Sequence, residues 1–296
     1  RTALWRRLGE DTCSWLGGHC ASAFVDVDKF YDSLAPSRVI KAMLGLQYSA
    51  LLLCLSLQAH WGVRFLSLAG SLGPAVQVSR SIIAGCTSSN SLARGYMYCI
   101  LERMVYSLPR TITEQYVDDL FVHVEGHRSA LTTDLVNAVG MISIMLDEAH
   151  LKMSSKTVVV ASTAEVARNI RKQLWSEHSL RVEISGSGKD LGTDAYAGSF
   201  KRTPVMKTRF QKTKRRVSRI AALKRMARKA DARSKTHGKR SPCPSVLWNR
   251  GAKAAALYGA ALVGLSPASY EKAIRLAVTA AAPDAAHDCP TSTINL

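Results

Sequence analysis

The sequence lacks paired cysteines and lacks any long hydrophobic run. Its seven cysteines form no CxxC pair, so no zinc finger, zinc knuckle or disulfide is predicted. The apolar stretches at residues 50–57 and 252–265 are shorter than the roughly 18–20 residues that span a bilayer. No signal peptide is visible, because the chain opens with Arg1 and a charged segment. We therefore expect a soluble intracellular protein, nuclear or cytoplasmic, without a membrane partner.

Acidic residues are scarce relative to basic ones. The chain has 22 Asp and Glu against 40 Lys and Arg, which gives a net charge of +18. Residues 201–240 carry 17 Lys and Arg against one acid, Asp231, and so supply +16 of that charge. Such a concentration indicates a phosphate-binding surface, whose binding should be independent of sequence and weakened by salt.

The same stretch has an apolar pattern that predicts a helix. The residues at helical spacing are Val217, Ile220, Ala221, Leu223, Met226 and Ala227. A helix with one apolar and one basic face is therefore predicted, and a solvated or disordered basic tail is the alternative.

Residues 113–126, TEQYVDDLFVHVEG, place two adjacent carboxylates, Asp118 and Asp119, inside an apolar run. Apolar β-branched and aromatic residues on both sides predict two short strands joined by a turn. Two carboxylates at the tip of a mostly buried hairpin would need a counter-charge to stay ionised, and Mg²⁺ is the usual partner of such oxygen ligands. An acidic turn that merely caps a hairpin is the alternative.

A third carboxylate, Asp26, follows the apolar Phe24 and Val25 in the segment AFVDVDKFYDSL. This position fits the end of a strand that lies beside the hairpin. Three carboxylates that converge from two strands can hold two Mg²⁺ ions about 3.5–4 Å apart, as in phosphoryl transfer. The alternative for Asp26 is a solvated acid at a strand end.

These acidic motifs resemble those of a known family. FVDVDKFYDSL and YVDD, in this order, resemble the A and C motifs of the reverse-transcriptase palm. Residues 84–90, AGCTSSN, and 151–157, LKMSSKT, are similar to the QGCPLSP and LKxNxxKT motifs of non-LTR (LINE-type) retrotransposon enzymes. KDLG at residues 189–192 resembles the KYLG strand before the thumb. The resemblance implies an RNA-directed DNA polymerase that adds dNTPs to a DNA primer on an RNA template.

The resemblance also implies a catalytic set of Asp26, Asp118, Asp119 and Lys156. Asp26 and Asp118 would be the principal ligands of two Mg²⁺ ions, for which Mn²⁺ could substitute. Asp119 would be a weaker or outer ligand, and the Val27 carbonyl a further oxygen. Lys156 matches the lysine near the departing pyrophosphate, where an ammonium can neutralise or protonate the leaving oxygen; taken alone, it is an ordinary surface lysine.

Nucleotide contacts are implied for Tyr31, Ala84 and Gly85. Tyr31 stands five residues after Asp26, where the family places a bulky ring beneath the incoming sugar and so excludes a 2′-OH. Without the flanking aspartates, Tyr31 would be a core aromatic. Gly85 allows close approach of the backbone to a base pair, whereas Ala84 replaces the glutamine of the family.

Nucleic-acid contacts are expected from the loop residues Ser88, Ser89 and Asn90, whose polar groups can bond phosphate or sugar oxygens. The same residues could begin a helix, since Ser and Asn are favoured caps. Asn90 replaces the proline of the family motif, and Ser154 replaces an asparagine. The basic residues expected to bind nucleic acid are Lys201, Arg202, Lys207, Arg209, Lys212, Lys214, Arg215, Arg216 and Arg219.

The expected fold is an α+β right-hand polymerase palm, in which helices cover one face of an antiparallel sheet. We predict helices at residues 1–22, 36–61, 90–108 and 129–148, a hairpin within 63–83 and a strand at 156–161. The domains would be the palm with partial fingers at 1–200, a basic thumb at 201–244 and a small helical segment with a loose tail at 245–296.

Only 23 residues precede Phe24, where the family carries a fingers region, so we expect a fragment shortened at its N-terminus. Two other functions stay open. One is a related palm polymerase that copies RNA into RNA, against which Tyr31 argues because its ring leaves no room for a 2′-OH. The other is a decayed retroelement that acts only as a basic nucleic-acid-binding protein.

Overall fold

The computed structural model describes residues 2–190, 193–196, 203–233 and 244–281. The chain divides into two compact units, one of residues 8–191 and 196–200 and the other of residues 1–7, 192–195 and 201–296. The second of these units contains both the expected thumb segment and the expected C-terminal segment.

The first unit is built on a five-stranded sheet. Its strands are β1 (His19–Val25), β4 (Ile112–Tyr116), β5 (Asp119–Gly126), β6 (Val158–Ala161) and β7 (Glu183–Ser185), in the order β4-β5-β1-β6-β7. Every pairing is antiparallel except that of β6 with β7, which is parallel. The sheet is therefore mixed, because helix α7 (Ala164–His178) connects β6 to β7 and returns the chain in the same direction.

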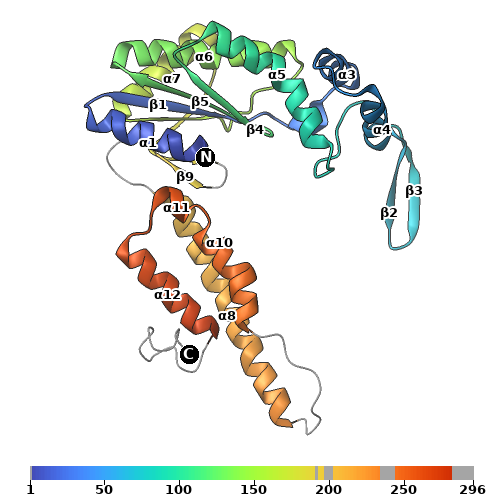
Figure 1. The fold of residues 1–296 in the computed structure, drawn as a ribbon, viewed down its shortest axis with the longest axis vertical. Coiled ribbons are helices and arrows are strands. Elements are labelled where there is room, and N and C mark those ends of the chain that lie inside the picture. The colour runs from blue at the N-terminus through green and yellow to red at the C-terminus, as the bar shows by residue number, and fades with distance from the viewer. Residues whose placement is uncertain (1, 191–192, 197–202, 234–243, 282–296) are drawn as a thin grey trace. The chain divides into compact units, whose positions relative to one another are not determined.

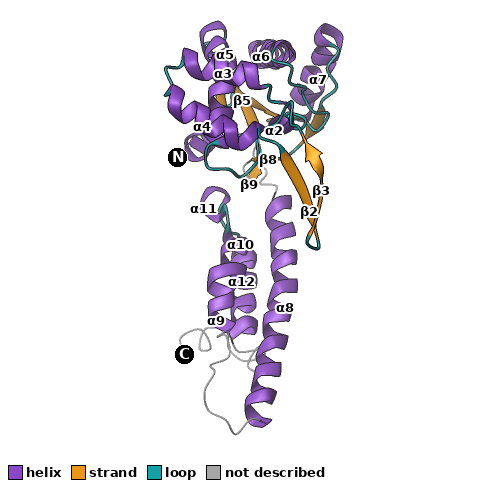
Figure 2. Ribbon diagram, turned by 90° about the vertical axis from the view of Figure 1, so that its right-hand side faces the viewer, coloured by secondary structure: helices purple, strands orange, loops and turns teal. Residues whose placement is uncertain are grey.

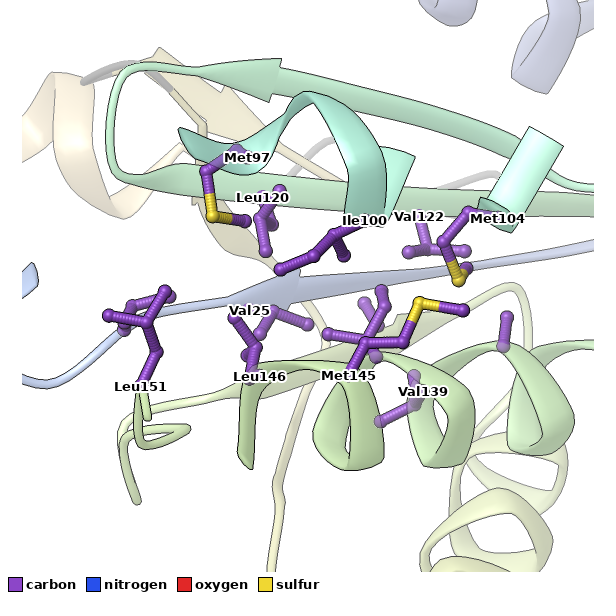
Figure 3. Close-up of a cluster of buried hydrophobic side chains, with 14 of the residues drawn as sticks. Val25, Met97, Ile100, Met104, Leu120, Val122, Val139, Met145, Leu146 and Leu151 are labelled. Atoms are coloured by element: carbon purple, nitrogen blue, oxygen red, sulfur yellow. The ribbon is translucent and has the colours of Figure 1, made fainter. Parts of the chain in front are cut away.

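Three helices cover one face of this sheet: α5 (Ser89–Ser107), α6 (Arg128–Glu148) and α7 (Figure 1). In the core between them, Val25, Leu120 and Val122 of the sheet meet methionine and aliphatic side chains of α5 and α6 (Figure 3). Burial of each such side chain contributes about 1.5–3 kcal/mol. The expected α+β class is confirmed.

The opposite face of the sheet is not bare. Cys13 of α1 (Thr2–Trp15) packs there against Cys20 of β1 and Val160 of β6. Helices are thus not confined to one face, which corrects the expected arrangement. The prediction of one helix over residues 1–22 is also corrected, because β1 begins at His19.

Among the described helices, α6 is the one that is long and apolar enough to cross a bilayer. Ten of its residues are buried, and it packs against β1, β5, α5 and α7. These contacts are those of a core helix.

The segment predicted as one helix over residues 36–61 forms two, α3 (Pro36–Gly45) and α4 (Ala50–Trp61). The break lies at Gln47, whose φ of 56° is left-handed, and Ser49 caps α4 by accepting from the Leu52 N–H at 3.5 Å. The expected hairpin follows as β2 (Arg64–Leu68) and β3 (Ser71–Val76). A short helix, α2 (Phe30–Ser33), follows Asp26.

The second unit contains the long basic helix α8 (Pro204–Arg233), which runs alongside α10 (Lys253–Leu257) and α12 (Pro267–Ala281) (Figure 2). In the chain, α9 (Pro244–Leu247) and a π-helical segment, η1 (Trp248–Ala252), lie between α8 and α10. Helix α11 (Ala260–Val263) follows α10. The short strands β8 (Gly188–Asp190) and β9 (Thr193–Ala195) precede α8.

The buried carboxylate of Asp194 in β9 caps the start of α8. Its two oxygens accept from the main-chain N–H groups of Val205 and Met206 at 2.7 and 2.9 Å. These N–H groups have no partner within the helix, and the carboxylate also lies at the positive end of the helix dipole. Asp194 thus fixes where the basic helix begins.

Candidate active site

The strand register brings the acidic motifs to one end of the sheet. Val25, the last residue of β1, lies opposite Leu120 of β5, so that Asp26 leaves β1 beside the point where Asp119 begins β5. In the β4–β5 hairpin, Tyr116 pairs with Asp119. Val117 and Asp118 therefore form a two-residue turn next to Asp26. The two acidic motifs, which are far apart in the sequence, are thus neighbours in the structure.

The turn itself has an unusual backbone. Val117 has φ of 62°, a region that β-branched residues rarely adopt. A positive φ at the first turn residue alone is the pattern of a type II′ turn, in which glycine is preferred. The side-chain amide of Gln115 donates to the Val117 carbonyl at 2.6 Å. This bond holds the turn and fixes the point from which Asp118 extends.

Both Asp118 and Asp119 are exposed. The expectation of a desolvated acidic pair is therefore wrong, and the hairpin that carries the pair includes the edge strand β4. Asp26, by contrast, is half-buried.

A metal site at this position would need ligands from outside the protein. In the described part of the chain, no three His, Cys, Asp or Glu side chains are grouped closely enough to hold a metal ion. Mg²⁺ usually takes only one or two protein carboxylates and completes its shell with waters and substrate phosphates. The exposed oxygen donors at this end of the sheet fit such an open site, and they do not fit a cage made of protein alone.

Tyr31 lies within electrostatic reach of Asp118. Burial, and secondly the Asp118 carboxylate, raise the pKa of the Tyr31 phenol above its ordinary value. The Tyr31 hydroxyl donates to Oδ1 of Asn90 at 3.0 Å. Residues of the FVDVDKFYDSL, AGCTSSN and YVDD segments therefore meet around one aromatic ring.

The LKMSSKT segment joins the same site through its backbone. The Ser154 N–H donates to the Asp26 carbonyl at 2.8 Å, and the Asp28 N–H donates to the Lys152 carbonyl at 2.8 Å. These two bonds flank the bridge between Val27 and Met153, so this pairing does not use the Val27 carbonyl. Lys156 is exposed, and its N–H donates to the Ser154 hydroxyl at 3.2 Å.

The loop before α5 is held by internal hydrogen bonds. Ser89 is buried and its hydroxyl donates to the Cys86 carbonyl at 2.6 Å, while the Ser88 hydroxyl bonds the ring of His60 at 3.1 Å and the Cys86 sulfur at 3.4 Å. Their side chains thus hold the loop together, in addition to any contact with nucleic acid. Ala84 and Gly85 are exposed, and Gly85 has φ of 87°, which favours glycine.

His60 is a structural residue that the sequence does not mark. Its ring is fully buried, Nδ1 accepts from the Ile83 N–H at 3.0 Å, and Nε2 faces Ser88. Burial, and secondly Arg64, lower the pKa of His60. Nothing in the pattern around residue 60 distinguishes it, because the hydrogen-bond partners of its ring lie more than twenty residues away.

The basic candidates divide by environment. Lys207, Lys212, Lys214, Arg215, Arg216 and Arg219 are exposed on α8. Arg209 instead donates to the Tyr258 carbonyl at 2.7 Å and stacks on the Tyr258 ring at 4.5 Å from its centroid. Lys201 and Arg202 lie outside the described residues.

The apolar face of α8 also differs from the prediction. Val217, Ile220 and Ala221 are buried as expected, and Met206, Phe210 and Thr213 join them. Leu223 and Met226 are exposed at 54% and 66%. Only the side of α8 that contacts α10 and α12 is buried, and it does not include every apolar residue of the stretch. The side chain of Ala227 lies outside the described part. The exposed basic residues occupy the remaining face.

No protein-family model matches the sequence, and no curated protein matches it. Among solved structures, an apo telomerase from Candida tropicalis, truncated from its C-terminal domain, is similar over 65% of this chain and 37% of its own, with 11% identity and a TM-score of 0.46. Telomerases from Candida tropicalis and Candida albicans, each in complex with a TWJ fragment of telomeric RNA, are similar over 98% and 100% of this chain, with 10% and 12% identity and TM-scores of 0.44 and 0.45.

The chain covers 51% and 54% of those two telomerases, and therefore spans about half their length. This level of similarity does not indicate a function, which has to be inferred from the residues of the chain itself.

Proposed function

We propose that the chain is the palm and thumb portion of a reverse transcriptase of the non-LTR retrotransposon type. It would add dNTPs to a DNA primer on an RNA template. The supporting observation is the strand register that places Asp26, Asp118 and Asp119 at one end of the sheet, with Tyr31 beside Asp118. The two acidic motifs on which the resemblance rests thus lie next to each other.

Each residue would act according to its position. Asp26 and Asp118 would bind Mg²⁺, or Mn²⁺ in its place, with Asp119 as an outer ligand and the Val27 carbonyl as a further oxygen. Two such ions stabilise the attacking and leaving oxygens of phosphoryl transfer when they are bound. The Tyr31 ring would exclude a 2′-OH, and Lys156 would neutralise the departing pyrophosphate. The exposed basic face of α8 would hold the phosphate backbone of the primer–template duplex.

Primer extension tests this proposal. The full chain is incubated with an RNA template, a DNA primer and Mg²⁺, with dNTPs or rNTPs, beside Asp118→Asn and the matched control Asp147→Asn, an exposed aspartate at the end of α6. We expect extension with dNTPs by the wild type and the control but not by Asp118→Asn. Duplex binding by Asp118→Asn should be nearly intact, because binding would rest on α8.

Other outcomes identify other functions. A clear preference for rNTPs would indicate an RNA-directed RNA polymerase instead. Salt-sensitive duplex binding without any extension would overturn the polymerase assignment and leave a basic nucleic-acid-binding protein. Equal loss of extension and binding in Asp118→Asn would show that the roles of the sheet and of α8 are misassigned.

A further inference from the structure

The hydroxyl of Tyr31 is hydrogen-bonded to one side chain, Asn90, and lies in the electrostatic field of another, Asp118. It donates to Oδ1 of Asn90 at 3.0 Å, while the Asp118 carboxylate lies close enough to act on it electrostatically. A carboxylate forms stronger, charge-assisted hydrogen bonds than an amide oxygen does. A phenol without the Asn90 acceptor would therefore turn towards Asp118.

Asn90 is well placed to hold the ring. It lies in the first turn of α5, a helix of 19 residues whose buried residues, including Leu92, Ala93 and Met97, anchor it in the core. Side chains carried by rigid, packed helices hold their partners more closely than side chains on loops do. The backbone that carries the Asn90 acceptor is therefore fixed in place.

The main chain of Tyr31 is also fixed by a hydrogen bond. Its carbonyl accepts from the Ile82 N–H at 2.8 Å, and the neighbouring Ser81 N–H donates to the Leu34 carbonyl at 3.2 Å. The ring also packs edge-on against Phe30, with 5.4 Å between the centroids. The backbone and the base of the ring are thus held, and within the described part of the chain the hydrogen bond to Asn90 holds the hydroxyl end.

We propose that Asn90 is a positioning residue for sugar selection, which holds the Tyr31 ring so that its edge faces the 2′ position of the incoming nucleotide and its hydroxyl stays away from Asp118. This inference rests on the proposed polymerase function. It also gives Asn90 a role other than nucleic-acid contact. The proline of the family motif has no side-chain acceptor, so this chain fixes its ring in a different way.

Two measurements on the full chain test the inference. The first compares kcat/KM for dNTP and rNTP incorporation in the wild type, Asn90→Ala, Tyr31→Phe and the double variant. Loss of one hydrogen bond should raise the rNTP-to-dNTP ratio by about fivefold in each single variant. The double variant should show no further rise, because both changes remove the same bond. Ser91→Ala, an exposed neighbour on α5, serves as the matched control and should keep the wild-type ratio.

The second measurement needs no nucleotide. Thermal unfolding is measured for the wild type, the two single variants and the double variant. The double variant should be destabilised by less than the sum of the effects of the two single substitutions. An additive result would mean that the bond is absent, and it would overturn the inference.

The outcomes distinguish this inference from the proposed function. Extension by the wild type with an unchanged ratio in both single variants would refute the role of Asn90 and leave the polymerase standing. No extension by the wild type would refute the polymerase, and the inference would fall with it.

Discussion

The ring of His60 in α4 and the hydroxyl of Ser88 lie 3.1 Å apart, and this hydrogen bond joins α4 to the loop that precedes α5. Because Nδ1 accepts from the Ile83 N–H, the neutral ring must carry its proton on Nε2 and donate it to Ser88. A protonated ring would lose the acceptor that Ile83 requires. The loop is therefore held by a neutral, buried histidine.

This arrangement makes stability depend on pH. Burial lowers the pKa of folded His60 below the ordinary value of 6.5, so the unfolded chain takes up a proton first as the pH falls. Stability is then fully present above pH 6.5 and is lost as the pH falls through the folded pKa. Urea unfolding at pH 7.5 and 5.5 should show this loss in the wild type and a smaller one in His60→Gln. An equal loss in both proteins would contradict the assignment.

A second pH effect is expected at lower pH. Glu125 accepts from His123 Nε2 at 2.9 Å, and this bond lowers the pKa of the Glu125 carboxyl below 4.5. The contribution of Glu125 is present above pH 4.5 and is lost as the pH falls through the folded pKa. Acid unfolding of Glu125→Gln should therefore have a shallower dependence on pH than that of the wild type.

Glu165 provides the control for this experiment. Its pKa is also lowered, by the hydrogen bond from Arg128. The side chain of Glu165 is 59% exposed, however, whereas His123, the partner of Glu125, is fully buried. Exposed ion pairs contribute little to stability. A larger effect in Glu165→Gln than in Glu125→Gln would contradict this interpretation.

The backbone at Val117 predicts that a glycine variant is more stable than an alanine variant, the reverse of the usual order. With φ of 62°, the position favours glycine, although alanine normally stabilises a fold relative to glycine. We expect Val117→Gly to be more stable than Val117→Ala by about 1 kcal/mol, the low end of the cost of such strain. Chemical unfolding of the two variants measures the difference. A more stable alanine variant would mean that the turn is not strained.

The basic face of α8 predicts a specific change in salt dependence. Reversal of two exposed charges, Lys212→Glu with Arg216→Glu, should weaken duplex binding. The slope of log K against log salt should also fall by about 0.7–0.9 for each phosphate that the variant no longer neutralises. The control reverses Arg171 and Lys172, which are exposed on α7. Similar weakening in both variants would show that binding follows net charge and not the surface of α8.

Packing at Gly140 predicts a destabilised variant. A Cβ at Gly140 of α6 would overlap the ring of His178, whereas a Cβ at Gly45, in the last turn of α3, meets nothing within 4 Å. Gly140→Ala should therefore destabilise the fold by about 1–3 kcal/mol. Gly45→Ala should stabilise it by roughly 0.5–1 kcal/mol, since alanine is the better helix former. Thermal unfolding of the two variants gives the comparison, and equal stability would refute the close approach of His178.

Local features of the fold were predictable from residues that act on their neighbours in the chain. The apolar spacing before Glu148 predicted α6, and the β-branched runs around Asp118 predicted the β4–β5 hairpin. The break between α3 and α4 was missed, because the apolar period continues across Gln47 and only its left-handed backbone ends the helix. The parallel strand β7 was missed because a three-residue strand carries too short a pattern.

The sequence alone determined the chemistry that this protein can offer: carboxylates after apolar strands, an aromatic five residues after Asp26, and a basic helix. These depend on residue identity and short spacing. Only the tertiary structure decided that Asp118 and Asp119 are exposed, that Arg209 is bound to Tyr258, and that Tyr31 is held by Asn90. Such contacts join residues far apart in the chain. They depend on strand register and helix packing, which no local pattern specifies.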